Sequence, residues 1–365
     1  MRLALLTEIP APFRIAQWNA LSATSDIDLR VLLLGERDPR RSYVPNRDNW
    51  RFDARVLAGR DLSVGGRWLV VSRGVRRQLD SFRPHVILVG GWNQPAFHQA
   101  AQYARRSQIP LVVWTESTAR DQRPGLLALE LLKRRIVASA SAFVVPGRAA
   151  LEYVQSFGVP AQRIVVAPNS VEPSIRERIE AARATRAELR RKLGIDGCWY
   201  LCVSRLSPEK GVDVLVRAFS GVPSGELAVI GGGPEETKLR RLAGPTVRLL
   251  GAVSQEELVQ WYAAADVFVL ASRSETWGMV LSEAAVAGLP LVTSEAPGAA
   301  YDLVEPGVNG FRVAVGDEAA LRDALVAVGA DEALRSRAAS RSRELVSQAT
   351  PEGWAAAVAQ LVRSL

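Results

Sequence analysis

Cysteine and histidine are scarce in this chain of 365 residues, which contains two of each. Cys198 and Cys202 flank an apolar run without the two-residue spacing of a metal or redox pair, so we expect buried, reduced thiols and no disulfide framework. Two histidines are too few for a histidine-rich metal site. Asp26-Ile27-Asp28 has the spacing of a metal-binding pair, but its polar and apolar alternation is typical of the start of a strand. The sequence therefore predicts no metal site.

Long apolar runs are also absent. No stretch approaches the roughly 18 residues of a membrane span, and Met1–Thr7 is too short for the apolar part of a signal peptide. Apolar residues make up 48% of the chain and charged residues 23%, which is a globular composition. We therefore expect a cytoplasmic protein, long enough for two domains of ordinary size.

Basic residues are concentrated in the first half of the chain. Residues 1–180 carry a net charge of +10, and the remainder carries −2. The densest part is Arg37–Arg83, within which Arg67–Arg77 is predicted to form a helix with a basic face and Trp68 as an aromatic anchor. Such a helix can lie on an acidic membrane surface, such as the inner face of the plasma membrane. The alternative is a solvated, arginine-rich face.

Short apolar runs alternate with segments of helical period along the whole chain. In the first half these runs are Leu3–Thr7, Leu29–Leu34, Val86–Gly90, Leu111–Thr115, Ala142–Pro146 and Ile164–Ala167. A charged stretch, Ile175–Leu193, is predicted to be an exposed connector, and the alternation then restarts at Tyr200–Ser204. The pattern predicts an α/β fold of two tandem doubly wound parallel-sheet (Rossmann-like) domains, residues 1–170 and 171–350. Ligands of such sheets bind beyond the carboxyl ends of the strands.

Two cations follow the strand Tyr200–Ser204. Arg205 and Lys210 lie in the turn before a predicted helix, where amide groups and the positive end of the helix favour an anion such as a diphosphate. Taken singly, either cation is typical of a solvated surface. The next strand ends in Gly231-Gly232-Gly233, which suits close approach of a ligand. It lacks the third glycine of a dinucleotide-binding fingerprint, so a nicotinamide enzyme is not expected.

Two carboxylates separated by seven residues, Glu275 and Glu283, follow the strand Val267–Ala271. Glu283 lies in a helix that is apolar on most faces, so its ionised form needs a cation or a ligand as partner. The three strand ends belong to one predicted sheet and should face one cleft. Cations at the first, glycines at the second and carboxylates at the third are an arrangement for a nucleotide diphosphate sugar.

These residues resemble the retaining glycosyltransferases of family four, which have the GT-B fold. The resemblance covers roughly residues 196–315 and weakens toward the N-terminus, although Pro168-Asn169-Ser170-Val171 is similar to the interdomain segment of the family. It implies that a C-terminal helix over residues 351–365 packs back on the first domain. It also implies transfer of a sugar from a UDP- or GDP-sugar to an acceptor hydroxyl, with attack from the leaving-group face and the departing phosphate helping to take the acceptor proton.

The resemblance implies a role for each matching residue. Arg205 and Lys210 would hold the diphosphate, Glu283 the ribose, and Glu275 the donor sugar. Trp277-Gly278-Met279-Val280 would present backbone amides to sugar and phosphate. Gly232 would approach the donor, and the segment Gly251–Ser254, with Val253 at its centre, would border the base. No cofactor beyond the donor and no metal is implied.

Two departures from the family concern the acceptor side. The loop after the first strand, which contains Glu8, lacks the glycine pair that members often have, and the position where many have a histidine falls in Trp114-Thr115-Glu116-Ser117. Glu116 or His98 is a candidate for an acceptor-side role, although the helical period around His98 favours a packed helix residue. The excess positive charge of the first half predicts an anionic or lipid-linked acceptor.

Two other functions fit parts of the sequence. A nucleotide-sugar epimerase on the same fold would need acid and base groups in the first domain, for which Glu8, His98 and Glu116 are the candidates. A non-catalytic binder of nucleic acid or anionic lipid would use the basic half, with the second domain a relic. That alternative does not explain why cations and carboxylates follow the strands of one sheet, so no nucleic-acid partner is predicted.

Overall fold

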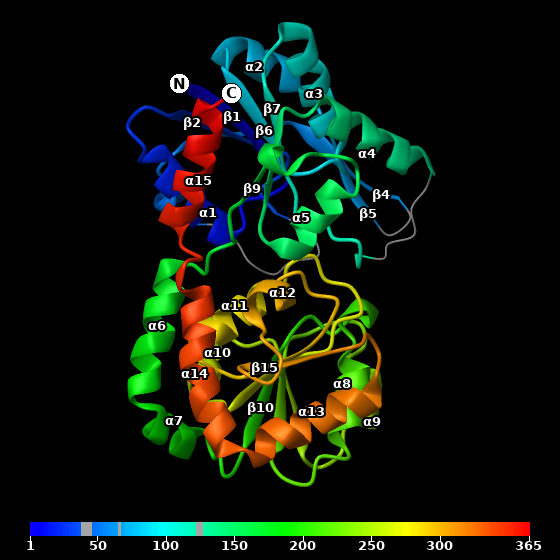
Figure 1. Ribbon diagram of the computed structural model, residues 1–365, viewed down its shortest axis with the longest axis vertical. Helices are drawn as coiled ribbons and strands as arrows, with labels where there is room; N and C mark the ends of the chain where they lie inside the picture. Colours follow the sequence, from blue (N-terminus) through cyan, green and yellow to red (C-terminus); the bar gives the residue numbers. More distant parts are fainter. Residues whose placement is uncertain (38–45, 65–66, 122–126) are drawn as a thin grey trace.

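The computed structural model describes residues 1–37, 46–64, 67–121 and 127–365. Figure 1 shows two α/β domains, one above the other, with helices on both faces of each sheet. The first domain contains a parallel seven-stranded sheet in the order β3-β2-β1-β6-β7-β8-β9. Its strands are β1 (Arg2–Thr7), β2 (Asp28–Leu33), β3 (Asp53–Val56), β6 (Val86–Val89), β7 (Leu111–Trp114), β8 (Ala142–Val145) and β9 (Ile164–Val166).

The second domain contains a parallel six-stranded sheet in the order β12-β11-β10-β13-β14-β15. Its strands are β10 (Trp199–Val203), β11 (Glu226–Ile230), β12 (Val247–Gly251), β13 (Val267–Leu270), β14 (Leu291–Ser294) and β15 (Gly310–Val313). The structure thus confirms the predicted pair of parallel-sheet domains. The strand order reverses between β10 and β13, and a reversal of this kind opens the crevice in which doubly wound sheets bind ligands.

The helices cover both sheets because the strands are buried on both faces, as in β6 and β7, where every residue is buried. The first domain has α1 (Pro12–Ser22), α2 (Val75–Phe82), α3 (Pro95–Ser107), α4 (Leu127–Ser139) and α5 (Arg148–Gln155). The second has α8 (Val212–Phe219), α9 (Glu236–Leu242), α10 (Gln255–Ala264), α11 (Met279–Val286), α12 (Ala300–Leu303), α13 (Glu318–Ala330) and α14 (Glu332–Ser347). Among the residues that the structure describes, no helix is long and apolar enough to cross a membrane.

The last helix, α15 (Pro351–Arg363), leaves the second domain and lies against α1 of the first (Figure 1). Thr350 caps it by accepting a hydrogen bond from Gly353 N at 3.0 Å, and Pro351 occupies its first turn. Trp354 is 1% exposed, and its ring lies 4.9 Å from that of Trp114 at the end of β7. The final residues of the chain therefore complete the core of the first domain.

The connector between the domains is helical and lies along the surface of the second domain. It forms α6 (Pro173–Ala184) and α7 (Arg186–Leu193), and it packs on α10 instead of standing free. Ile179 is fully buried, and Arg190 pairs with Asp266, just before β13, at 2.8 Å. The structure confirms that the connector is largely exposed, because α7 has no buried residue and α6 has only Ile179. The sequence did not show that its arginines donate to carbonyl and carboxylate groups at the end of α10.

The predicted basic helix over Arg67–Arg77 was wrong. The segment forms β5 (Arg67–Ser72), antiparallel to β4 (Gly59–Val64), and α2 begins only at Val75. Val70 is 1% exposed whereas Val71 is 43% exposed, which is the alternation of a strand with one covered face. Gly74, with φ at 86°, ends the hairpin and starts the helix. Residues 38–45 and 65–66 of the arginine-rich segment lie outside the described residues.

The remaining small predictions concern the thiols and the aspartate pair. Cys202 is buried, which raises the pKa of its thiol to about 12, and Cys198 is half-buried; both are free cysteines. Asp28 begins β2, as predicted, and Asp26 pairs with Arg363 of α15 at 2.6 Å. No group of three potential metal ligands occurs within the described part of the chain.

Candidate active site

Lys210 and Glu275 form the centre of the candidate site. Lys210 follows β10, Glu275 follows β13, and their side chains make an ion pair in which both are mostly buried, at 18% and 16% exposure. Backbone bonds fix the two loops together, because Glu209 O accepts from Arg273 N at 2.8 Å and from Ser274 N at 3.1 Å. The sheet thus brings together a predicted cation and a predicted carboxylate that are 65 residues apart.

Glycine at position 211 allows this close approach. Its φ of 61° lies in the left-handed region, and a Cβ there would overlap the carbonyl oxygen of Ala271 at the end of β13. The turn that carries Lys210 therefore lies directly against the loop that leads to Glu275.

The three glycines after β11 differ in the space around them. A Cβ at Gly231 or Gly233 would overlap a carbonyl oxygen of the neighbouring loop, that of Ser204 or Leu206 respectively. Gly232 has open space around the position of a Cβ, and its carbonyl accepts from Leu206 N at 2.9 Å. Two of the glycines thus allow two loops to pack together, and only Gly232 offers room for a ligand.

Glu283 lies in α11 and accepts a hydrogen bond from the Tyr262 hydroxyl of α10 at 2.7 Å. Burial raises the pKa of the Glu283 carboxyl to about 7, although this hydrogen bond opposes the rise. The partner that the sequence required is therefore a neutral tyrosine and not an interior arginine. When it is ionised, the Glu283 carboxylate has more lone pairs than the Tyr262 hydroxyl uses, so it can also accept hydrogen bonds from ligand hydroxyls.

The turn before α11 holds the other residues of the predicted carboxylate loop. Gly278 has φ at 94° and precedes the first helical residue, Met279. Leu281 N donates to Gly278 O at 2.9 Å, whereas the first two amides of α11, those of Met279 and Val280, have no partner within the helix. Trp277 is only 4% exposed, so it can offer its backbone but not its ring to a ligand. Met279 and Val280 are half-buried.

Val253 lies in the loop between β12 and α10. This loop is fixed to the glycine turn, because Gly231 N donates to Gly251 O at 2.8 Å. Ser254 caps α10 in a capping box with Glu257. The segment therefore borders the same edge of the sheet as Gly232.

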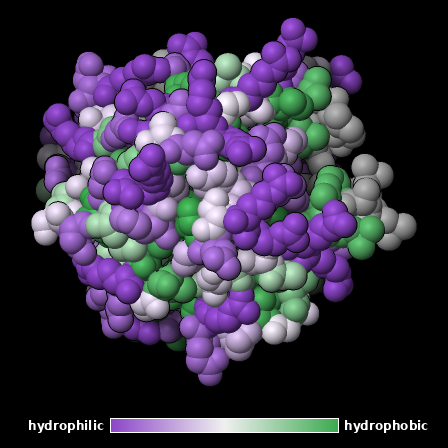
Figure 2. Space-filling model, turned by 90° about the horizontal axis from the view of Figure 1, so that it is seen from above, coloured by the Kyte–Doolittle hydropathy of each residue, from purple (hydrophilic) through white to green (hydrophobic). Residues whose placement is uncertain are grey.

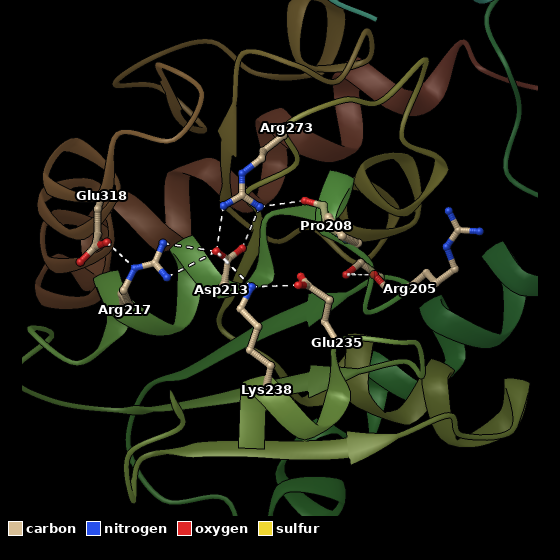
Figure 3. Close-up of polar contacts among 9 residues, drawn as sticks. Arg205, Pro208, Asp213, Arg217, Glu235, Lys238, Arg273 and Glu318 are labelled. Carbon is tan, nitrogen blue, oxygen red and sulfur yellow. Dashed lines mark hydrogen bonds and ion pairs between the residues drawn. The ribbon is translucent and has the colours of Figure 1, made fainter. Parts of the chain in front are cut away.

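Arg205 is not brought into the Lys210–Glu275 pair. Its side chain is 44% exposed, its Nε donates to Ser207 Oγ at 3.2 Å, and its guanidinium pairs with Glu209. In Figure 3 this guanidinium points away from the neighbouring charged cluster. It lies beside the site, with a competing carboxylate four residues away.

The charged cluster in Figure 3 was missed by sequence reasoning. Asp213, in the first turn of α8, accepts from both terminal nitrogens of Arg273, at 2.7 and 2.8 Å, and Arg217 and Lys238 lie nearby. Arg273, as the principal cause, holds the pKa of Asp213 down at about 2. Arg273 also donates to Pro208 O at 2.8 Å, so the cluster links the loop after β13 to the loop after β10.

A polar group of the first domain lies beyond the carboxyl ends of β1, β7 and β9. Arg14 of α1 donates to Thr7 Oγ1 at 2.9 Å and pairs with Glu116 at 3.2 Å, and Asn169 donates to the same Glu116 oxygen at 3.0 Å. The sequence suggested Glu116 and the segment that contains Asn169, but it did not show that Asn169 and Arg14 would meet Glu116, because the three come from distant parts of the chain. Asn169 is fully buried, and its side-chain oxygen lacks a hydrogen-bond partner among the described residues.

His98 and Glu8 each have hydrogen-bond partners within the first domain. A ring nitrogen of His98 lies 2.9 Å from the carbonyl oxygen of Trp92, and burial lowers the pKa of the imidazole. Glu8 accepts hydrogen bonds from Asn93 at 2.8 Å and from Gln94 at 2.6 Å. His98 is thus a packed helix residue, as its helical period suggested.

Comparisons with known proteins identify the family. A family model described as "Glycosyl transferases group 1" matches residues 198–331, and one described as "Glycosyl transferase 4-like domain" matches residues 16–170. The two matches fall on the two observed domains. The chain belongs to this family of glycosyltransferase enzymes, as the resemblance predicted.

Two curated relatives show how far the similarity extends. The D-inositol 3-phosphate glycosyltransferase of Xylanimonas cellulosilytica is 31% identical over 281 residues, 71% of this chain and 66% of the relative. The lipopolysaccharide core biosynthesis glycosyltransferase LpsE of Rhizobium meliloti is 33% identical over 168 residues, 45% of this chain and 49% of the relative. The chain thus spans between about half and two thirds of the length of these relatives.

Solved structures share the whole fold. Anabaena HepE in complex with UDP has a TM-score of 0.79 at 20% identity, and each chain is covered completely. WaaG, a glycosyltransferase involved in lipopolysaccharide biosynthesis, has a TM-score of 0.71 at 18% identity, with 99% of each chain covered. The architecture is the GT-B fold.

Proposed function

We propose that this protein is a retaining glycosyltransferase that moves a sugar from a UDP- or GDP-sugar to an acceptor hydroxyl in glycoconjugate biosynthesis. The observation that carries the proposal is the buried Lys210–Glu275 ion pair at the point where the strand order of the second sheet reverses. Support for the donor comes from relatives: the HepE structure contains UDP, and a Mycobacterium tuberculosis relative is named a GDP-mannose-dependent mannosyltransferase.

In this mechanism Lys210 binds the donor diphosphate and stabilises the negative charge that grows on it as the sugar leaves. Charge stabilisation by preorganised groups in a site of low water content is commonly the largest contribution to catalysis. Glu275 holds Lys210 in place, accepts hydrogen bonds from the donor sugar and faces the positive charge that develops at the anomeric carbon. The free amides of Met279 and Val280, at the start of α11, contribute further donors to sugar and phosphate.

Glu283 would bind the ribose hydroxyls, with Tyr262 holding its carboxylate in position. Arg205 would turn from Glu209 to the diphosphate when the donor enters. The acceptor hydroxyl would attack from the leaving-group face and pass its proton to the departing phosphate. No metal or cofactor other than the donor takes part in this proposal, so turnover should survive a chelator such as EDTA.

The test is incubation with a panel of UDP- and GDP-sugars, with and without acceptor alcohols. Sugar transfer or slow donor hydrolysis supports the proposal, interconversion of sugars indicates an epimerase, and neither result together with nucleotide-independent anion binding indicates a binder. Glu275→Gln should keep nucleoside diphosphate binding and lose about 100-fold or more in turnover. Glu256→Gln, the same change at an exposed position of α10, is the matched control.

We also propose an anionic, lipid-linked acceptor reached at the inner face of the plasma membrane. The hairpin surface, which we define as Arg60, Leu62, Val71, Arg73, Arg76 and Arg77, joins exposed arginines to two exposed apolar side chains. Opposite residues of an antiparallel pair share one face, which places Arg60 beside Val71. Relatives named for lipopolysaccharide core and phosphatidylinositol mannoside synthesis support an acceptor of this kind.

This contact should be electrostatic. Figure 2 shows that hydrophilic residues dominate the end face of the first domain, with hydrophobic ones only in small groups. Each arginine near an acidic bilayer contributes about 1 kcal/mol, screened beyond roughly 8 Å at physiological salt. Binding to vesicles containing phosphatidylserine should therefore fall steeply with salt and be lost on changing Arg73, Arg76 and Arg77 to Ser. Equal sedimentation of variant and wild type would remove the hairpin surface from the proposal.

A further inference from the structure

The two domains touch through α12 of the second domain and the start of α5 of the first. Arg148 N, at the first residue of α5, lies 3.2 Å from each carboxylate oxygen of Asp302 and donates to them. A carboxylate at this end of a helix is stabilised by the free amide groups and by the helix dipole. Asp302 is half-buried whereas Arg148 is exposed, so this interdomain hydrogen bond is partly accessible to water.

Gly147, just before α5, leaves room for this contact. A Cβ at position 147 would overlap Asp302 Oδ2 and would lie 2.8 Å from Cζ3 of Trp277. The φ of Gly147 is −177°, an extended conformation that any residue adopts, so glycine is required there by space and not by backbone strain. The backbone of the first domain therefore contacts both Asp302 and the loop that carries Glu275.

That loop and α12 behave as one packed unit. Trp277 O accepts from Ala299 N at 3.0 Å, Thr276 O accepts from Gly298 N at 3.2 Å, and Ala299 O in turn accepts from Asp302 N at 3.1 Å. Because Trp277 is 4% exposed, the loop cannot shift without moving this helix. A force on Asp302 is thus transmitted to the turn that precedes α11.

Two further contacts join the first domain to the same unit. Ser274 Oγ donates to Asp121 Oδ1 at 2.8 Å. The Arg120 guanidinium lies 4.3 Å from the ring centre of Tyr301, and that of Arg312, from the second domain, lies 4.6 Å from it. The contacts between the domains named above all reach residues between 274 and 302 of the second domain.

We propose that Asp302 is a positioning residue, which docks the unit of residues 274–302 onto the start of α5 and so sets Glu275 and the first amides of α11 in their reactive arrangement. The role in turnover rests on the proposed function, whereas the docking itself does not. Lys210 and the loops after β10 and β11 belong to the second domain alone. Binding of a free nucleoside diphosphate should therefore depend little on Asp302, while turnover should depend on it strongly.

The test compares Asp302→Ala and Gly147→Ala with the wild type by small-angle X-ray scattering, calorimetry with UDP and GDP, and steady-state kinetics. We expect a broader distance distribution, kcat lower by tenfold or more, and a nucleotide Kd within threefold of the wild type. The double variant should lose little more than either single variant, because both changes break one contact. Asp317→Asn, which alters a helix cap of α13, and Gly244→Ala, which adds a Cβ in open space, are the matched controls.

Unchanged scattering of both variants would overturn the proposal, even with an active enzyme. Altered scattering with unchanged kcat would also overturn it, since docking would then not position the loop. If no nucleotide sugar supports turnover, the proposed function fails, and scattering still decides whether Asp302 docks the domains. Gly147→Ala changes the other side of the contact, so it provides the same test if Asp302→Ala folds poorly.

Discussion

Glu283→Gln should stabilise the protein at alkaline pH while weakening nucleotide binding. In the folded protein, burial raises the pKa of this carboxyl from 4.5 to about 7. Between pH 4.5 and 7 the folded state therefore holds a proton that the unfolded state has released, and the stability contributed by this group falls as pH rises through that window. Above pH 7 the folded protein carries the full cost of a buried carboxylate.

The size of the effect follows from the pKa change. One pKa unit is worth about 1.4 kcal/mol, so the rise from 4.5 to about 7 corresponds to at most about 3.5 kcal/mol. Glutamine keeps an oxygen that can accept from the Tyr262 hydroxyl but has no charge to desolvate. The variant should therefore differ least from the wild type near pH 5 and exceed its free energy of unfolding by up to about 3.5 kcal/mol at pH 8.

Urea unfolding followed by circular dichroism from pH 5 to 8.5 measures this difference directly. Taking the difference between variant and wild type cancels other groups that titrate in the same range, such as Asp302, whose pKa burial raises to about 6. Glu256→Gln, at an exposed position of α10, is the control and should show no such trend. A stability difference that does not change with pH would refute the reasoning. Reduced UDP or GDP affinity in the more stable variant would assign Glu283 to ligand binding.

Three other predictions concern single side chains. Lys210→Ala should weaken nucleoside diphosphate binding by roughly ten- to a hundredfold in calorimetry, and Arg205→Ala by less, because that guanidinium is half-exposed and already paired. Gly231→Ala should lower the melting temperature, since its Cβ would overlap a neighbouring carbonyl oxygen, whereas Gly232→Ala should leave it nearly unchanged and test ligand space. Trp354→Ala should destabilise the first domain by about 3–5 kcal/mol in chemical unfolding, and a loss below 1 kcal/mol would contradict the packing of α15.

Much of the fold was predictable because its determinants are local. Short apolar runs that alternate with segments of helical period indicate a parallel sheet covered by helices. The carboxyl ends of its strands lie at one edge of the sheet. This arrangement was enough to predict that Lys210 and Glu275 lie together, although 65 residues separate them. Positions at strand ends therefore carried more information than composition did.

The failed and missing predictions depend on contacts between distant residues. Residues 67–77 have too few apolar positions to separate a strand period from a helical one, and pairing with β4 decides the outcome. Nothing in the local sequence links Tyr262 to Glu283, or Asp213 to Arg273, since each pair forms only when separate helices and loops meet. The run of glycines after β11 indicated a close approach to the backbone. It did not show that the loop after β10, and not a ligand, makes this approach at Gly231 and Gly233.

The return of α15 to the first domain means that the chain passes between the domains twice. The first crossing leads into α6 at Pro173 and the second into α15 at Pro351, and residues of both crossings line one cavity with α1. Two adjacent covalent links restrict the relative motion of the domains far more than a single link would. Rotation about a line through these links remains open, whereas sliding and twisting are opposed. We therefore expect the cleft to open and close about this side of the molecule, with the contact between Asp302 and Arg148 on the moving side.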